Sequence, residues 1–372
     1  MDLSLTESQE MLKSTARDLV EREFPKELLI EMDAGGRTFA PDAWERMREA
    51  GWTGMLTPRE YGGEGASFSD AAVVAQELGR GPVPGPFFGS AVLGVLTVLE
   101  AGTEGQRRAI LSPVASGEVV LGMAVTEPEY GWDAGYVKCL AQQVGGGYRL
   151  EGTKLFAQDL EGASQIVCAA RLENDAVRLF VVDATSPGVS VRGRGGFSTG
   201  AFEVRLEGVE VAGDSLLGDG AGDGWAALER AMEKASAVLC AYQVGASEQV
   251  FETTLDYSNT RVQFGVAIGR FQRVQDHIID MVNHLDAARW TTNEALWKLD
   301  TGRPYSASVH MAKAVTSEAY YQVCNGAHEV HAGIGVMREY GLTLHTKMSR
   351  TLYDYLGNPG LHKRRLGDAL PL

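Results

Sequence analysis

The stretch Trp225–Thr260, WAALERAMEKASAVLCAYQVGASEQVFETTLDYSNT, decides how this chain folds, because it keeps one helical period with few helix breakers. The stretches 271–299, 306–332 and 339–356 keep the same period. Apolar residues that recur with this period give each helix one face to bury against its neighbours. We therefore predict four long helices that pack as a bundle in the C-terminal part of the chain.

The stretch before this bundle, from about residue 119 to residue 211, has a different period. Apolar and polar residues alternate over the short segments 148–151, 165–168, 178–182 and 202–206, and glycine-rich turns separate these segments. Alternation over short segments predicts β-strands. The absence of helical patterns between the segments favours an antiparallel sandwich or barrel over βαβ units.

The N-terminal part of the chain is helical again. Thr6 and Gln9 have the spacing of a capping box, and amphipathic stretches follow up to about Gly117. The predicted fold class is therefore multidomain α+β: an N-terminal helical domain (1–117), a central antiparallel β-sandwich or barrel (118–214) and a C-terminal four-helix bundle (215–372).

The composition excludes some classes of function. The chain has 372 residues, with 34 Lys and Arg against 49 Asp and Glu, which gives a formal net charge of −15. A chain this acidic is a poor candidate for nucleic acid, whose binding depends on counterion release from phosphates. The His and Cys residues have no metal-ligand spacing, so we expect no metal site and reduced, mostly buried thiols.

The chain is also expected to be cytoplasmic and soluble. Its first residues, Met1 to Ser4, are not basic, so they do not resemble a signal peptide. The longest apolar stretch, Ala91–Leu99, is too short to span a bilayer.

Four segments carry more chemical information together than separately. They are 124–133 (AVTEPEYGWD), 152–159 (GTKLFAQD), 261–272 (RVQFGVAIGRFQ) and 331–335 (HAGIG), the last followed by Glu339 and Tyr340. Taken singly, each has an ordinary structural explanation: a turn, a strand or an interhelical loop.

Jointly the four segments resemble the acyl-CoA dehydrogenase family, and the resemblance covers essentially the whole chain. The order of the segments matches: a helical N-terminal domain with Tyr61-Gly62-Gly63, a β-domain that opens on Thr-Glu-Pro, and a bundle that carries Arg-x-Gln-Phe-Gly. Within the family, the chain is most similar to a bacterial branch that includes enzymes acting on steroid side chains and alicyclic acyl chains. The implied setting is lipid or steroid catabolism.

The resemblance implies an FAD cofactor between the central domain and the bundle, surrounded by residues of two subunits. The implied cofactor-binding residues are Thr126, Phe156, Gln158, Arg261, Gln263, Phe264, Phe271, Gln272, Glu329, Val330 and Gly333. Thr126 and Phe156 match positions beside the flavin ring, and Gln158 stands where relatives have Ser or Thr. Arg261 matches the arginine that binds the diphosphate of a neighbouring subunit's FAD, a role that suits a planar guanidinium. The segment 329–333 matches the one that approaches this cofactor across the dimer.

The implied reaction is α,β-dehydrogenation of an acyl-CoA thioester, in which a base removes the α-proton while a hydride leaves the β-carbon for flavin N5. The expected partners are the acyl-CoA substrate, an electron-transfer flavoprotein as acceptor, and further subunits in a homo- or hetero-oligomer, as a dimer of dimers. Trp132, Tyr355 and Leu356 are the implied substrate-binding residues. Trp132 stands where the family usually has Ser, so this bulk would reshape the acyl-CoA path.

The catalytic base departs from the family pattern. The usual glutamate position falls on Leu356, and the alternative position on the long helix falls on Ala235. Neither side chain can accept a proton. Glu229 and Glu233 lie on the same helix as Ala235 and are candidates, although a solvated helix face explains both. Tyr355, Asp354 and Tyr242 are further candidates.

Three functions therefore stay open. The chain is an active dehydrogenase with an unusually placed base, or a base-lacking subunit that completes the FAD site of a heteromeric dehydrogenase, or a flavoenzyme that acts on a CoA ester without dehydrogenating it.

Overall fold

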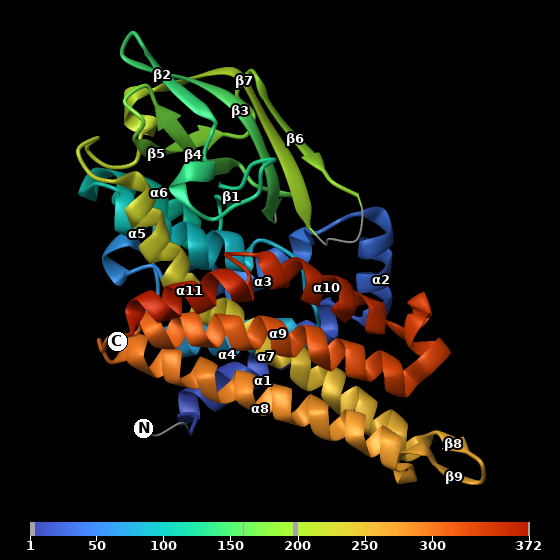
Figure 1. The fold of residues 1–372 in the computed structure, drawn as a ribbon. Coiled ribbons are helices and arrows are strands. Elements are labelled where there is room, and N and C mark those ends of the chain that lie inside the picture. The colour runs from blue at the N-terminus through green and yellow to red at the C-terminus, as the bar shows by residue number, and fades with distance from the viewer. Residues whose placement is uncertain (1–3, 159, 196–199, 371–372) are drawn as a thin grey trace. The chain divides into compact units, whose positions relative to one another are not determined.

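The computed structural model describes residues 4–158, 160–195 and 200–370. These residues form two compact units. The helical unit comprises Met1–Gly35, Phe68–Val83 and Ser236–Leu372, and the sheet unit comprises Gly36–Ser67 and Pro84–Ala235. Along the chain, helices are followed by strands and then by helices again, which confirms the predicted fold class (Figure 1). The predicted domain boundaries at residues 117 and 214 stay a prediction.

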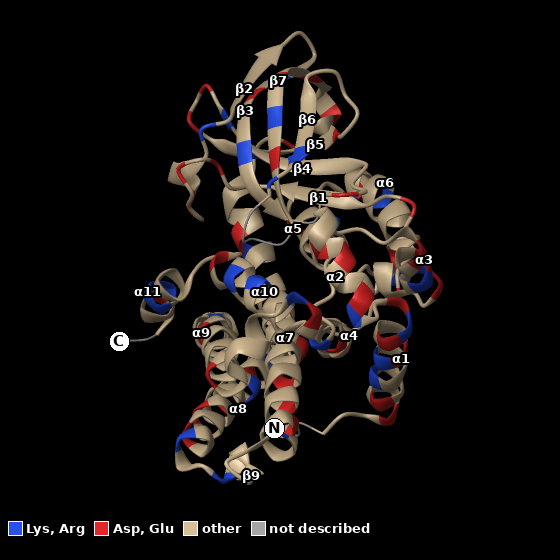
Figure 2. Cartoon of the chain, turned by 90° about the vertical axis from the view of Figure 1, so that its right-hand side faces the viewer, with Lys and Arg blue, Asp and Glu red and all other residues tan. Residues whose placement is uncertain are grey.

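The helical unit is built from helices that include the four of the predicted bundle. Their bounds are α1 (Glu7–Glu23), α2 (Lys26–Gly35), α4 (Phe68–Arg80), α8 (Gln272–Asp300), α9 (Ser306–His331), α10 (Leu342–Asp354) and α11 (Pro359–Ala369), and α7 (Gly224–Thr260) enters this unit from the sheet unit. α8 and α9 lie side by side along most of their length (Figure 1). Acidic and basic residues are interspersed along α1 and α8 (Figure 2). Thr6 and Gln9 form the predicted capping box at the start of α1.

Two glycines let α4 and α7 pack with backbone against backbone. A Cβ on Gly79 would lie 2.0 Å from the carbonyl oxygen of Tyr242, and a Cβ on Gly245 would lie 1.9 Å from that of Gln76. Any side chain at these positions would push the two helices apart, because real contacts are never this short. The glycines therefore fix how α7 sits in the helical unit.

The sheet unit combines short helices with one seven-stranded sheet. Its helices are α3 (Pro41–Glu49), α5 (Val95–Ala101) and α6 (Glu104–Ala115). Its strands are β1 (Leu121–Ala124), β2 (Leu140–Val144), β3 (Gly147–Gln158), β4 (Gln165–Leu172), β5 (Val177–Asp183), β6 (Val189–Gly193) and β7 (Ala201–Ala212). The strand order is β1-β4-β2-β3-β7-β6, and β5 pairs with β4. Apolar residues of β3, β4, β5 and β7 form the core of this unit.

Three details differ from the sequence-based expectation. β4 runs parallel to β1 and to β2, so the sheet is mixed and not wholly antiparallel. The last predicted bundle helix begins at Leu342, because residues 338–340 form a separate 3-10 turn and Gly341 has a φ of 91°. The short helix α11 follows the four bundle helices.

None of the helices in the described part of the chain is long and apolar enough to cross a bilayer. Within the same residues, no group of three or more His, Cys, Asp and Glu is placed to bind a metal ion. All four cysteines are buried and free.

Candidate functional site

Two of the segments singled out in the sequence lie against each other in the sheet unit. The backbone N–H of Leu155 donates to the carbonyl oxygen of Thr126 at 2.9 Å. In return, the Thr126 hydroxyl donates to the carbonyl oxygen of Leu155 at 2.5 Å. These two reciprocal bonds place Thr126 beside the residue that precedes Phe156, so the two positions implied to border a flavin ring are brought together.

A buried ion pair joins the same two segments. The Lys154 ammonium donates to Oε1 of Glu127 at 2.6 Å and to the carbonyl oxygen of Val125 at 3.3 Å. Glu127 also accepts the backbone N–H groups of Lys138 and Cys139 at 2.8 and 2.9 Å. Each charged group thus has several partners, which compensates for its removal from water. Both residues stand inside the quoted segments, but nothing in the spacing of the sequence predicts that they pair.

Phe156 sits on a β-bulge that turns its ring outward. Lys154 pairs with Val204 of β7, and Ala157 pairs with Phe202. Between these two pairs, β3 has one residue more than β7. Phe156 has a φ of 57° and is 42% exposed. Its ring meets that of Tyr130 edge to face, with centroids 5.3 Å apart. A bulge of this kind re-aims a side chain, so Phe156 presents an open aromatic face beside Thr126.

Left-handed backbone at non-glycine residues concentrates in the four quoted segments and at Leu356. The non-glycine residues with a clearly positive φ in the described chain are Tyr130, Phe156, Asp175, Phe264, Ala332 and Leu356. All except Asp175 lie in the four quoted segments or at Leu356, where the resemblance implies a base. Such residues each cost about 1–3 kcal/mol and cluster at functional sites. This distribution is independent of the sequence motifs and points to the same places.

In the helical unit, Arg261 stands where α7 gives way to a tight hairpin. Its N–H donates to the carbonyl oxygen of Tyr257, and its own carbonyl oxygen accepts the N–H of Ile268, both at 2.9 Å. The hairpin strands are β8 (Val262–Gln263) and β9 (Val266–Ala267). Arg261 itself is exposed, so its guanidinium is available to a ligand.

The hairpin exposes aromatic surface. Phe264, at its tip, has a φ of 54° and is 93% exposed. Its ring lies edge to face with that of Phe271, with centroids 6.1 Å apart. Gln263 and Gln272 are exposed beside these rings. A nearly bare aromatic ring next to an exposed arginine and two amides suits contact with another molecule better than contact with water.

An aromatic cluster joins the end of α7 to the end of α9. The Tyr257 ring stacks on His331 with centroids 4.4 Å apart, and Tyr340 contacts both rings. The segment that contains Gly333 therefore lies near the start of the hairpin. Gly333 is exposed, and a Cβ there would meet no atom within 4 Å. The backbone at Gly333 is thus open to an outside partner.

Glu329 borders a small cavity between α8 and α9. This cavity of about 240 Å³ is lined by His277, Asp280, Met281 and His284 of α8 and by Gln322, Asn325, Gly326 and Glu329 of α9. Gly326 is required there, because its Cβ would lie 2.8 Å from a side-chain carbon of Met281. Val330, the next residue implied to bind cofactor, is buried in the helix packing.

The positions expected to hold a catalytic base are apolar. Leu356 is 2% exposed, and Ala235 is fully buried. Glu229 and Glu233 are half-buried on α7 within the sheet unit, whereas Leu356 lies in the helical unit. Of the other implied contacts, Trp132, Gln158 and Tyr355 are all buried. Asp159, which ends the second quoted segment, lies outside the described residues.

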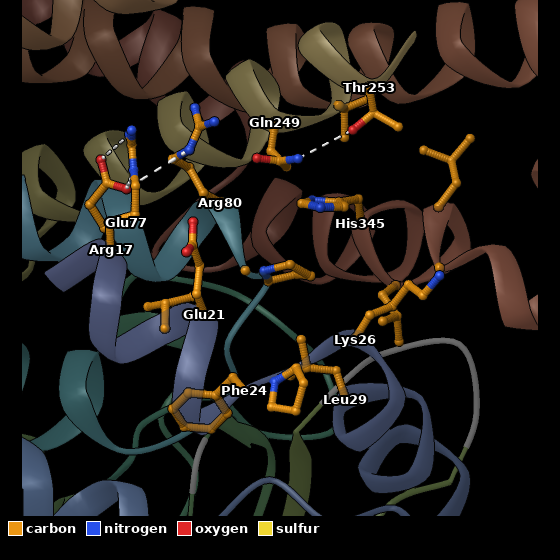
Figure 3. Close-up of a pocket in the computed structure, with 18 of the residues that line it drawn as sticks. Arg17, Glu21, Phe24, Lys26, Leu29, Glu77, Arg80, Gln249, Thr253 and His345 are labelled. Atoms are coloured by element: carbon orange, nitrogen blue, oxygen red, sulfur yellow. Dashed lines mark hydrogen bonds and ion pairs between the residues drawn. The ribbon is translucent and has the colours of Figure 1, made fainter. Parts of the chain in front are cut away.

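Sequence reasoning missed a larger cavity in the helical unit, of about 590 Å³, shown in Figure 3. Residues of α1, α2, α4, α7 and α10 line it. Arg17 binds the buried Glu77 through two N–H groups at 2.9 and 3.0 Å, and Arg80 pairs with Glu77 and Glu252. Burial lowers the pKa of His345, also on the wall, to about 3, so that ring is neutral at ordinary pH. These residues come from five separate segments, so no motif could have revealed the cavity.

Comparisons with known proteins cover almost the whole chain. The family models of the acyl-CoA dehydrogenase N-terminal and C-terminal domains match residues 6–118 and 222–370. The acryloyl-CoA reductase (NADH) of Anaerotignum propionicum is 30% identical over 376 residues, covering 98% of this chain and 94% of the reductase. A solved structure described as the electron transferring flavoprotein of Acidaminococcus fermentans has 26% identity, a TM-score of 0.91 and 100% coverage of both chains. Another, described as the Tcur3481-Tcur3483 steroid ACAD, has 27% identity and a TM-score of 0.85 over 98% of this chain and 97% of that one.

Proposed function

Because the chain belongs to the acyl-CoA dehydrogenase family, we propose that it acts in FAD-dependent α,β-dehydrogenation of an acyl-CoA thioester. When bound, FAD supplies the acceptor for the hydride that leaves the β-carbon. The observation that carries the proposal is the connection between the segments of Thr126 and Phe156. The two hydrogen bonds between Thr126 and Leu155 and the buried Glu127–Lys154 pair make this connection. These contacts hold Thr126 and the exposed ring of Phe156 in one fixed arrangement.

The chain's own residues fit the two halves of this cofactor. At the flavin end, the exposed face of Phe156 suits a planar ring, and Thr126 fixes the adjoining backbone. At the diphosphate end, the exposed Arg261 offers a planar fork of N–H donors. Phe264 and Phe271 offer aromatic edges and faces for an adenine ring. We assign this second group to the cofactor of a neighbouring subunit, so that the site is complete only in a dimer or a larger oligomer.

We propose a second function on the basis of Leu356. A leucine there cannot take the α-proton, and Ala235 cannot replace it. This favours a chain that completes the FAD site of a heteromeric dehydrogenase in which a homologous partner supplies the base. The description of one structural relative, the Tcur3481-Tcur3483 steroid ACAD, joins two protein names. This supports a heteromeric dehydrogenase and a steroid-like acyl group as substrate. If the chain works alone, Glu229 or Glu233 is the base.

Purification of the full chain, alone and co-expressed with a neighbouring homologue, separates these functions. If the chain alone binds FAD and acyl-CoAs bleach the flavin absorbance under anaerobic conditions, it is a self-sufficient dehydrogenase. If it is colourless alone but yellow and reducible in the co-purified complex, it is the base-lacking subunit. If FAD binds in either preparation and no acyl-CoA reduces it, the dehydrogenation proposal is wrong, and non-dehydrogenating chemistry on a CoA ester takes its place.

We further propose an electron-transfer flavoprotein as the acceptor that reoxidises the flavin. The family resemblance and the likeness to the structure described as an electron transferring flavoprotein support this choice. The test is steady-state turnover with a purified electron-transfer flavoprotein, with molecular oxygen and an artificial dye as comparison acceptors. Turnover with the dye alone would contradict it.

A further inference from the structure

We propose that His310 and His362 form a positioning pair that fixes the turn at Leu356, the place where relatives carry the catalytic base. The importance of this turn for catalysis rests on the proposed function, whereas the positioning itself does not. The two rings come from different helices, α9 and α11, and both are buried. Together they connect α9 to one backbone oxygen of the turn.

The hydrogen-bond geometry dictates where the protons are. Nε2 of His362 lies 3.0 Å from the carbonyl oxygen of Leu356, and a carbonyl oxygen only accepts, so this nitrogen carries the proton. Nδ1 of His362 lies 3.1 Å from Nδ1 of His310. In a neutral His362 ring this second nitrogen accepts, so His310 must donate from Nδ1. The chain of donation therefore runs from His310 to His362 to Leu356.

Both rings are held neutral, as this arrangement requires. Burial lowers the pKa of His310 to about 4, and the positive charge of Arg365 lowers it further in the same direction. Burial lowers the pKa of His362 to about 2, with smaller contributions from Lys313, His310 and Arg365. The cations Lys313 on α9 and Arg365 on α11 oppose an added proton on His362, and Arg365 opposes one on His310. The donor and acceptor roles therefore stay fixed at neutral pH.

The backbone of the turn is shaped to receive His362. Leu356 has a φ of 59° and Gly357 a φ of 110°. A Cβ on Gly357 would lie 2.9 Å from Nε2 of His362, so a side chain there would displace the imidazole. The N–H of Gly357 donates to the carbonyl oxygen of Asp354 at 2.9 Å and closes the turn. A left-handed leucine persists only where its surroundings hold it, and the His362 bond supplies such a constraint.

A buried lysine holds the other end of the same segment. Lys313 is fully buried on α9, three residues after His310, and donates to the carbonyl oxygen of Leu352 at 3.1 Å and to Oγ of Ser317 at 2.7 Å. Leu352 lies in the last turn of α10, where carbonyl oxygens lack a partner within the helix. Burial lowers the pKa of Lys313 to about 8, and its neighbours Asp354 and Cys240 raise it. α9 thus holds residues 352–356 at two points, directly at Leu352 through Lys313 and indirectly at Leu356 through His362.

Hydrogen exchange of the full-length oligomer tests this positioning without reference to activity. The variant His310→Leu removes the donor, and we expect the Gly357 amide to exchange about tenfold faster, because one hydrogen bond is lost. The variant His310→Asn keeps an N–H near the original Nδ1 position and should restore slow exchange. The control is His345→Asn, another buried histidine of the helical unit, which should leave exchange at Gly357 unchanged.

A second pair of variants covers the case in which His310→Leu does not fold. In His362→Gln the amide nitrogen can take the place of Nε2, whereas in His362→Asn it is too short to reach Leu356. We expect the Gly357 amide to exchange slowly in His362→Gln and fast in His362→Asn. ¹⁵N spectra of labelled histidine should show His310 protonated on Nδ1 and His362 on Nε2.

Protonation of His310 on Nε2 and of His362 on Nδ1 would overturn the proposal. Unchanged exchange of the Gly357 amide in both His310→Leu and His362→Asn would also overturn it. Equal acceleration in His345→Asn would also overturn it, since the effect would then be global loosening. If wild-type protein oxidises acyl-CoAs, His310→Leu should raise KM about fivefold or more while FAD content stays constant. If no acyl-CoA reacts, the proposed function fails, but the exchange result still decides the positioning.

Discussion

Lys154 Nζ and Glu127 Oε1 lie 2.6 Å apart, and neither side chain has appreciable contact with solvent. Two charges buried in this way are stable only when their remaining hydrogen-bonding groups are also matched. Here the carboxylate receives two backbone N–H groups in addition to the ammonium. The pair spans 27 residues of sequence and joins the segment that follows β1 to the edge of the bulge in β3. It is therefore a structural support of the surface to which we assign the flavin.

Replacement of one member of this pair should destabilise the protein strongly. In Lys154→Met, Glu127 keeps its buried charge without its ammonium partner, which costs about 3–5 kcal/mol. We expect a large fall in the free energy of unfolding, measured in urea, and loss of FAD on gel filtration. The control is Arg149→Ala on the same strand, whose pair with Glu210 is exposed and should matter little. Equal stability and FAD content in the two variants would show that the buried pair is dispensable.

Introduction of a carboxylate at Leu356 should create or increase dehydrogenase activity in the isolated chain. A base at the family position contributes about 10²–10⁴-fold in proton abstraction. The measured quantity is the rate of anaerobic flavin bleaching by acyl-CoA in Leu356→Glu. Leu356→Gln is the matched control, because it has the same shape and cannot take a proton. If both variants are as slow as the wild type, the base position inferred from the family is wrong for this chain.

Arg261 should matter for cofactor retention and not for folding. The exposed guanidinium makes no described contact that stabilises the helical unit, so Arg261→Ala should leave the melting temperature near that of the wild type. We expect FAD affinity to fall about 10- to 100-fold, from the loss of charge-assisted hydrogen bonds. Arg261→Lys should recover part of this loss, because lysine keeps the charge without the planar fork. Arg22→Ala, an exposed arginine on α1, is the control. Unchanged FAD affinity in Arg261→Ala would contradict the assignment.

Stability should fall on acidification even before carboxylates are protonated. The pKa of His345 is lowered from 6.5 to about 3 by burial. Below about pH 6.5, His345 therefore binds a proton in the unfolded chain and stays neutral in the folded chain. The free energy of unfolding falls as the pH falls below this value. His345 alone should cost about 2 kcal/mol between about pH 7 and about pH 5. Urea unfolding of the wild type and of His345→Gln at both pH values measures how much of the loss in unfolding free energy comes from His345. If the free energy of unfolding falls by the same amount in both proteins, the prediction for His345 is wrong.

Much of the fold was predictable because its signals are local. The helix 225–260, the bundle helices after it and the capping box at Thr6 depend on residues three or four positions apart. The strand segments depend on residues two apart. The parallel pairing of β4 with β1 and β2 was not predictable, since alternation along one strand does not identify its neighbour. The separate 3-10 turn before Leu342 was missed because its residues fit the helical period.

By itself, the sequence determined the order of helices and strands, the family, and the residue types at Leu356 and Ala235, the two positions where the resemblance implies a base. The tertiary structure alone decided which distant residues meet. It paired Glu127 with Lys154 and joined His310 to His362 across 52 residues. It also placed Phe156 on a bulge and Leu356 in a left-handed turn. The physical reason is that periodicity and motifs arise from near neighbours in the chain, whereas buried charges and strained backbone are stable only within a complete set of partners from separate segments.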